Sequence, residues 1–260
     1  MANTKRSLPK PDRLFIGTIG RAFRLLEGFS DGGGPLTLPE LAAAAGIDKS
    51  AAQRAAHTLE RLGYVEYSGG GLVPGRRLLE RSLDYLRANP IVARAMPVLA
   101  ELRRSVQERV DLSLFDGTSM LYLIRMQSKR DTFFGHLVGR RVPTYCTSGG
   151  RAALSALSED DVRHVLDQCD LRKLTPRTTI DIQQILECVT QARQNGYALA
   201  VEETHIGELA VGSAVLDRQG RPIAAIHVGA SLSDWEPDQF ERKIAPLVVA
   251  AARAVGELHK

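Results

Sequence analysis

Small polar and basic side chains recur at helical spacing between residues 49 and 57, and together they could contact a polyanion. The set is Lys49, Ser50, Ala51, Gln53, Arg54 and His57. Such a face suits a helix that enters the major groove of DNA, where hydroxyl, amide and cationic groups meet phosphates and base edges. An ordinary helical hairpin with a solvated polar face has the same spacing, so this pattern by itself leaves both interpretations open. Arg21, on a helix expected over residues 16–29, either contacts phosphate or is simply solvated.

Two short helices and a tight turn are predicted to position this face. Apolar residues fall at i, i+3, i+4 and i+7 from Leu38 to Ala45, with Thr37 as an N-cap and Gly46 at the end of the helix. Asp48 can cap a second helix. The apolar stripe of that helix is Ala52, Ala55, Ala56, Leu59 and Leu62. Residues 63–67 alternate like a strand, a glycine turn follows, and a return strand starts at residue 72. This order predicts a winged helix-turn-helix over residues 13–74.

Charge is unevenly distributed along the 260 residues, which carry a formal net charge of +4. Residues 1–88 contain 13 Lys and Arg against 9 Asp and Glu, whereas residues 89–260 contain 21 of each. The positive excess therefore lies in the part with the helix-turn-helix, as a polyanionic partner requires. Residues 1–12 contain charges and prolines but no apolar segment, which predicts a flexible basic arm and not a secretory signal.

The composition also limits location and partners. No apolar run approaches membrane-spanning length, so we expect no membrane partner. The three cysteines are an odd number without metal-ligand spacing, which fits a reducing cytoplasm. The six histidines show no metal-ligand spacing either, and we expect no metal and no cofactor.

Residues 75–90 predict a linker helix with a stripe of leucines, which Asn89 and Pro90 end. An exposed leucine stripe between domains usually packs against a partner, so a homodimer or a dimer of dimers is expected. A two-fold dimer would also present two recognition helices to two half-sites.

The remaining residues, 91–260, predict an α+β domain around a largely antiparallel sheet. Helices are expected at 91–107, 148–157, 159–169, 181–194 and 237–258. Strands are expected at 109–115, 120–126, 133–138, 197–202, 209–216 and 222–228.

A second candidate site lies at the start of the helix expected from Ser148. Thr147, Ser148 and Gly149 offer hydroxyls and backbone N–H groups, which predicts an anion site. With Arg141 nearby, the natural ligand is a carboxylate, although a solvated or ion-paired arginine is an equally ordinary interpretation. His227, in an apolar strand, is either a buried hydrogen-bonded residue or a pocket residue.

Two further residues of this region have competing interpretations. Tyr145 either faces an aromatic ligand or fills the core. Cys146 is by default a small buried hydrophobe, with a redox sensor as the alternative.

An enzyme is the competing functional class, namely a hydrolase that uses Cys146 or Ser148 with His227 or His205. The sequence supplies no nucleophile elbow, orienting carboxylate or oxyanion motif in a suitable context, so we expect no enzymatic activity. A purely architectural DNA-binding protein would not need an electrically neutral second domain of this size.

Several segments, in this order, make the chain resemble the IclR family of bacterial transcriptional regulators. They are residues 20–26, 46–54, 59–65, 138–143, 147–152, 174–178, 196–203 and 217–221. The resemblance implies an N-terminal winged helix-turn-helix, a linker helix and a C-terminal effector-binding domain with a GAF/PAS-like sheet. It further implies dimers or tetramers that bind double-stranded operator DNA and respond to small organic acids.

The resemblance also assigns residues to the two sites. Ser50, Ala51, Gln53 and Arg54 correspond to the recognition helix, and the effector pocket is lined by residues 143–151 and by Ala200, Ala210, His227 and Gly229. Many relatives carry an acidic residue at position 200, a cysteine at 210, and asparagine or serine at 227 and 229. The pocket is therefore expected to be retuned, and a glyoxylate-type ligand is not carried over.

Overall fold

The structure is a computed structural model that describes residues 13–31, 34–128 and 138–257. The chain forms two compact units, residues 1–88 and 89–260. The basic arm expected at residues 1–12 and nearly all of the strand expected at 133–138 lie outside the described residues.

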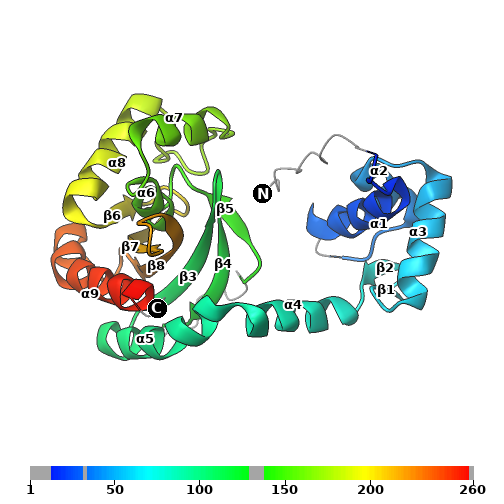
Figure 1. The fold of residues 1–260 in the computed structure, drawn as a ribbon, viewed down its shortest axis with the longest axis horizontal. Coiled ribbons are helices and arrows are strands. Elements are labelled where there is room, and N and C mark those ends of the chain that lie inside the picture. Colours follow the sequence, from blue (N-terminus) through cyan, green and yellow to red (C-terminus); the bar gives the residue numbers. More distant parts are fainter. Residues whose placement is uncertain (1–12, 32–33, 129–137, 258–260) are drawn as a thin grey trace. The chain divides into compact units, whose positions relative to one another are not determined.

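The first unit is a group of helices followed by a small hairpin (Figure 1). Its elements are α1 (Gly17–Glu27), the short 3-10 helix η1 (Gly28–Asp31), α2 (Leu38–Ala45), α3 (Lys49–Arg61), β1 (Val65–Ser68), β2 (Gly71–Pro74) and α4 (Arg77–Ala88). Strands β1 and β2 pair antiparallel. The apolar faces of α1, α2 and α3 share one core with residues from the hairpin, including Leu25, Leu41, Ala52 and Leu72.

Local sequence signals set the ends of α2 and α3. The Thr37 side chain accepts a hydrogen bond from the N–H of Glu40, whose carboxylate accepts one in return from the N–H of Thr37, which is a capping box. Gly46 ends α2 in the left-handed conformation, with φ of 62°, which glycine adopts without steric cost. Asp48 then caps α3 by accepting from the N–H of Ala51. Together these three caps fix the turn that orients α3.

Helix α4 differs from the other helices because none of its residues is buried. Leu79, Leu83 and Tyr85 are exposed, and an ion pair between Arg81 and Asp84 lies on the helix surface. The predicted leucine stripe is therefore present and faces solvent in the single chain.

The second unit is built on one six-stranded antiparallel sheet with the order β5-β4-β3-β8-β7-β6. The strands are β3 (Arg109–Asp116), β4 (Ser119–Met126), β5 (Arg141–Pro143), β6 (Ala198–Val201), β7 (Glu208–Leu216) and β8 (Pro222–Ser231). The helices are α5 (Pro90–Val106), α6 (Ser148–Leu154), α7 (Glu159–Asp167), α8 (Ile182–Asn195) and α9 (Pro237–Glu257).

Both faces of the sheet are covered by helices (Figure 1). Helix α9 packs on β7 and β8 with α5 beside it, whereas α6 packs on β7 and β8 with α8 behind it. Strand β8 is accordingly buried at nearly every position and does not alternate between buried and exposed residues. The expected α+β architecture with a largely antiparallel sheet is confirmed. No described helix is long and apolar enough to cross a membrane.

Candidate effector pocket and DNA-binding face

Strand register places a row of small residues across the face of the sheet that α6 covers. Ala200 on β6 pairs with Ala210 on β7, and Ala210 pairs with Gly229 on β8. Gly229 in turn pairs with Arg109 on β3. Three residues with little or no side chain therefore form a floor, and a single long cationic side chain stands at its β3 end.

The guanidinium group of Arg109 lies over Gly229 and is held between two carboxylates. Its Nε donates to Asp111 at 2.9 Å, and its terminal nitrogen donates to Glu208. Asp111 also accepts from Nε of Arg125 at 2.9 Å, so it is shared by two arginines while its side chain is fully buried. Glu208 in addition lies 3.3 Å from Nδ1 of His205.

These contacts outweigh the cost of burying Glu208. Burial by itself disfavours the charged form, but the hydrogen bond from His205 and the charge and hydrogen bond of Arg109 lower the pKa of Glu208 to about 2. Glu208 is therefore ionised at neutral pH.

His227 belongs to the next row of the sheet, beside Asp111 on β3 and Gly212 on β7. Its Nε2 is hydrogen-bonded to the hydroxyl of Ser113 at 2.8 Å, and its ring lies against Tyr122 with centroids 5.2 Å apart. Burial lowers the pKa of His227 to about 4, so the ring is neutral at physiological pH. Of the two interpretations, the hydrogen-bonded one is observed, and the residue also lines the cavity described next.

A small cavity of about 30 Å³ lies between this face of the sheet and the start of α6. Residues from β3, β4, α6, β6, β7 and β8 line it: Arg109, Tyr122, Thr147, Ser148, Ala200, Glu203, Thr204, Glu208, Leu209, Ala210 and His227. That volume holds about one or two water molecules, far less than the several hundred Å³ of a typical ligand site. The cavity as described is thus too small for a ligand of ordinary size.

Five residues that the sequence predicts for the pocket meet at this cavity: Thr147, Ser148, Ala200, Ala210 and His227. Gly149 and Gly229 lie directly beside it without lining it. A side chain at Gly149 would come within 3.3 Å of His227, and one at Gly229 would overlap the Arg109 guanidinium group. The absence of side chains there lets α6 approach β8 and lets Arg109 lie over the strand.

Three other predicted pocket residues have structural contacts and do not line the cavity. Arg141 pairs with Asp116 and donates to Ser119. Tyr145 donates its hydroxyl to the carbonyl of Arg172 at 2.6 Å, and its ring packs in a core cluster with Cys146. Arg141 is therefore ion-paired, and for Tyr145 and Cys146 the core interpretation is observed. None of the three lines the cavity as the resemblance implied, because β5 and the residues after it direct them to the sheet edge and into the core.

The first turn of α6 also departs from the expected anion site. Its N-cap hydroxyl, on Thr147, accepts from the N–H of Gly150, so that amide already has a partner. The backbone of Ser148 and Gly149 packs against Gly212 so closely that a side chain at position 212 would overlap it. The cationic side chain at the cavity, Arg109, is therefore the stronger anion-binding group.

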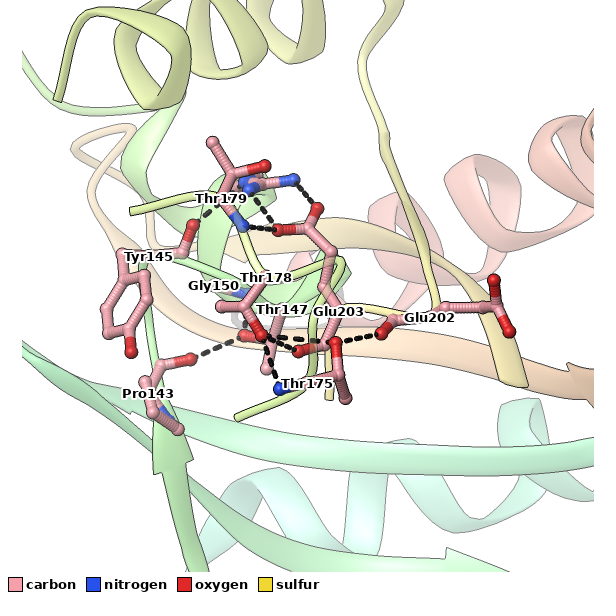
Figure 2. A network of polar contacts seen from close by, with 10 residues as sticks. Pro143, Tyr145, Thr147, Gly150, Thr175, Thr178, Thr179, Glu202 and Glu203 are labelled. Atoms are coloured by element: carbon pink, nitrogen blue, oxygen red, sulfur yellow. Dashed lines mark hydrogen bonds and ion pairs between the residues drawn. The ribbon is translucent and has the colours of Figure 1, made fainter. Parts of the chain in front are cut away.

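A buried ion pair holds α6 against the loop after β6 (Figure 2). Arg151 donates through both terminal nitrogens to Glu203 and through Nε to the carbonyl of Tyr145 at 2.8 Å. Glu203 accepts further from the N–H of Thr179 at 3.0 Å. Figure 2 shows the surrounding network, in which the hydroxyls of Thr175 and Thr178 bond the backbone carbonyls of Glu202 and Glu203.

The hydrolase alternative receives no support from this geometry. Cys146 is fully buried, and burial raises the pKa of its thiol to about 12, which suppresses the thiolate form. His227 is bonded to Ser113 and not to either proposed nucleophile. Among the described residues, no group of three or more His, Cys, Asp and Glu could hold a metal ion.

The candidate DNA-binding face lies on α3 in the first unit. Lys49, Ser50, Gln53, Arg54 and His57 are all exposed on this helix. Ala51 departs from the prediction because it is only 5% exposed. Its methyl group is therefore not part of the exposed face.

Arg21 on α1 is half-buried close to the start of α3. The hydrogen bond from the N–H of Ala51 lowers the pKa of Asp48, and the positive charge of Arg21 also lowers it. Arg21 therefore adds positive potential beside the N-terminal end of the exposed face.

Sequence reasoning missed six of the cavity-lining residues, of which Arg109 and Glu208 matter most. Both stand at the first position of a strand, and they meet only because β3 and β7 flank β8 in the sheet. The available signal was a charged residue at the start of each strand, but local sequence patterns cannot show that the two residues are partners.

Comparisons with known proteins agree with the two-unit organisation. The family "Bacterial transcriptional regulator IclR C-terminal" matches residues 83–257, and "IclR helix-turn-helix domain" matches residues 18–69. The Pca regulon regulatory protein of Pseudomonas putida is 27% identical over 242 residues, covering 92% of this chain and 82% of that protein.

Solved structures show the same fold. An IclR transcriptional regulator from Alicyclobacillus acidocaldarius superposes with a TM-score of 0.83 at 22% identity, covering 95% of this chain and all of that chain. An IclR homologue from Microbacterium hydrocarbonoxydans, in complex with 4-hydroxybenzoate, gives 0.78 at 20% identity, covering 93% and 98%. With two family matches that together span most of its length, the chain belongs to the IclR family of bacterial transcriptional regulators.

Proposed function

We propose that this chain is a cytoplasmic, sequence-specific DNA-binding regulator whose affinity for its operator is controlled by a small carboxylate. The observation that carries the proposal is the pairing of two features in one chain. One is a capped helix, α3, that exposes Lys49, Ser50, Gln53, Arg54 and His57 in the unit with the positive excess. The other is a small cavity in the second unit with an arginine at its wall.

The exposed face of α3 supplies groups for both kinds of DNA contact. Gln53 and Arg54 can form two hydrogen bonds to a base edge in the major groove, where glutamine pairs with adenine and arginine with guanine. Lys49, Arg21 and the hairpin β1–β2 would contact phosphates, which position the helix without reading sequence.

The effector assignment rests on the chemistry of the cavity and on a relative. Arg109 offers a cationic fork, Ser148 offers a hydroxyl, and Ala200 with Ala210 leave room along the floor. The Microbacterium homologue binds 4-hydroxybenzoate, which is a monocarboxylate. Because the cavity measures about 30 Å³, an acid of that size requires an opened conformation and would shift the protein toward it.

Dimerisation through α4 would link the two sites. The helix has no buried residue, and its apolar side chains Leu79, Leu83 and Tyr85 are exposed in the single chain. Packing two copies along this stripe would bury those side chains and set the distance between two α3 helices, and hence the spacing of the half-sites.

Binding of the purified full-length chain to labelled DNA from upstream of its own gene tests the proposal. Fluorescence anisotropy should show tighter binding to this DNA than to a shuffled sequence, with a steep loss of affinity as salt rises. A panel of small carboxylates should then contain acids that change the operator affinity and raise the melting temperature of the full chain. Equal affinity for operator and shuffled DNA would contradict the regulatory function. If acids raise the melting temperature of the protein but leave its operator affinity unchanged, the coupling between acid binding and DNA binding is contradicted.

A further inference from the structure

The carboxylates around Arg109 are held in two different ways. Asp111 is on the same strand, is fully buried, and is shared with Arg125, which donates to both of its oxygens at 2.9 and 3.4 Å. Glu208 is the first residue of β7, follows directly after the loop of residues 202–207, and its side chain is 19% exposed. Asp111 is therefore fixed, whereas Glu208 stands at the cavity wall with a route to solvent.

Both arginines in this part of the cavity already have carboxylate partners. Arg109 pairs with Asp111 and Glu208, and Arg125 pairs with Asp111. His205 lies 3.3 Å from Glu208, and His227 is neutral. A ligand carboxylate added to that set would leave an uncompensated negative charge in a buried site, which is strongly disfavoured. Uptake of an acid therefore requires one resident carboxylate to leave, and Glu208 is the one that can.

We propose that Glu208 occupies the position of the effector's carboxylate on Arg109, and that binding exchanges this internal carboxylate for that of a monocarboxylic acid. This inference rests on the proposed effector site. In this exchange Arg109 binds the carboxylate of the ligand, and Glu208 competes with the ligand for Arg109. No proton is required for the exchange, because one carboxylate replaces another on the same guanidinium group.

The exchange also accounts for how the small cavity opens. Glu208 lies at the end of the loop that supplies Glu203 and Thr204 to the cavity wall, so its outward movement enlarges the cavity from that side. A dicarboxylic acid is disfavoured, because the other arginines nearby, Arg125 and Arg151, already pair with Asp111 and Glu203. The ligand class is accordingly a monocarboxylate with a compact uncharged body.

Titration calorimetry of the full-length chain with benzoate, benzamide and phthalate tests this exchange. Glu208→Gln removes the competing charge but keeps the side-chain length, so it should bind benzoate at least about tenfold more tightly than the wild type. Arg109→Gln should bind it about 10 to 100-fold more weakly, the range for loss of a charge-assisted hydrogen bond. Benzamide, which has no charge, should respond little to either change. Phthalate should bind more weakly than benzoate in every form of the protein.

Matched controls come from an exposed pair on α5, Arg104 and Glu101, whose side chains interact at 2.7 Å. Arg104→Gln and Glu101→Gln make the same charge changes away from the cavity and should bind benzoate as the wild type does. Arg109→Lys keeps the charge without the fork and serves if Arg109→Gln does not fold, as judged by circular dichroism.

The single tryptophan gives a second readout. Gly207, next to Glu208, accepts a hydrogen bond from the N–H of Leu232 at 2.8 Å, and Trp235 lies just beyond, donating to Glu108 at 2.9 Å. Displacement of Glu208 should therefore change the emission of Trp235 when benzoate is added.

The proposal would be overturned if Arg109→Gln and Arg109→Lys bound benzoate with the same affinity as the wild type. It would also be overturned if Glu208→Gln weakened the binding of benzoate and of benzamide equally. Failure of both the wild type and Glu208→Gln to bind benzoate at millimolar concentration would overturn it as well. Operator binding by the wild type is measured separately, so each of these failures is distinguishable from failure of the regulatory function.

Discussion

Arg109 stands directly opposite Gly229 in the β3–β8 ladder, and its guanidinium group occupies the space that a side chain at position 229 would need. Gly229→Ala should push the guanidinium group aside and loosen its bond to Glu208. The cost in folding free energy should be modest, because the overlap is with the end of a flexible side chain. Benzoate affinity should fall, whereas Gly220→Ala, in an exposed turn, should leave that affinity unchanged although it strains a backbone with φ of 76°. Calorimetry on both variants provides the check.

Arg54→Ala should weaken operator binding by about 10 to 100-fold, because a base contact from arginine contributes roughly 1–3 kcal/mol. Arg253→Ala makes the same charge change at an exposed position of α9 in the second unit and should bind the operator like the wild type. Anisotropy titrations at several salt concentrations would also separate the two roles of Arg54. Loss of sequence preference indicates a base contact, whereas a smaller salt dependence with preference retained indicates a phosphate contact. Undiminished binding by Arg54→Ala would remove this residue from the interface.

Stability should fall as pH drops from about 6.5 to 4 because of His227. Burial lowers its pKa to about 4, with Asp111 and Glu208 opposing that shift and Arg109 and Arg125 reinforcing it. The unfolded chain therefore binds a proton that the folded chain does not, and stability is lost as the pH falls below the unfolded pKa. The loss is about 3 kcal/mol over this range.

Urea unfolding at a series of pH values would measure this dependence. His227→Asn should flatten the curve between pH 6.5 and 4, while His164→Asn, which changes a hydrogen-bonded histidine on the surface, should not. A wild-type curve that is level across this range would contradict the assignment.

Removal of the Arg151 side chain should be among the most destabilising single changes in the second unit. Arg151→Met leaves Glu203 buried without its cation, which typically costs about 3–5 kcal/mol. Arg151→Lys should cost less, because it restores the charge but cannot reproduce both the fork on Glu203 and the bond to the carbonyl of Tyr145.

The double variant Arg151→Met with Glu203→Met tests the pairing directly. It should recover part of the stability lost by Arg151→Met, since no buried charge is then left alone. Additive losses in urea unfolding would show that the two side chains act independently.

The ends of α2 and α3 could be predicted from local sequence alone. Thr37, Gly46 and Asp48 were expected to begin and end the two helices, and each does so with the expected hydrogen bond or backbone conformation. Caps follow from residues within four positions of each other, so no knowledge of the fold is needed. The family resemblance extended this reading to the overall architecture, which is confirmed.

The pocket was predicted only in part, for a physical reason. Ala200, Ala210 and His227 came from the resemblance, which carries the register of distant strands. Arg109 and Glu208 depart from any local pattern, because their contact depends on two strands separated in sequence by about 90 residues and joined across β8. Arg141 was assigned to the pocket from proximity in sequence, but it lies on the edge strand β5 and pairs with Asp116, the last residue of β3.

The loop between α7 and α8 is held in place by side chains and not by a backbone ladder. The hydroxyls of Thr175 and Thr178 bond the carbonyls of Glu202 and Glu203, and Thr179 donates its N–H to the Glu203 carboxylate. Two loops far apart in sequence therefore open together or not at all, as a single unit of local unfolding. Amide hydrogens of residues 174–179 should exchange with solvent at rates set by the loop after β6. Ligand binding in the cavity would then change the rate of amide hydrogen exchange in residues 174–179, although this segment does not contact the ligand.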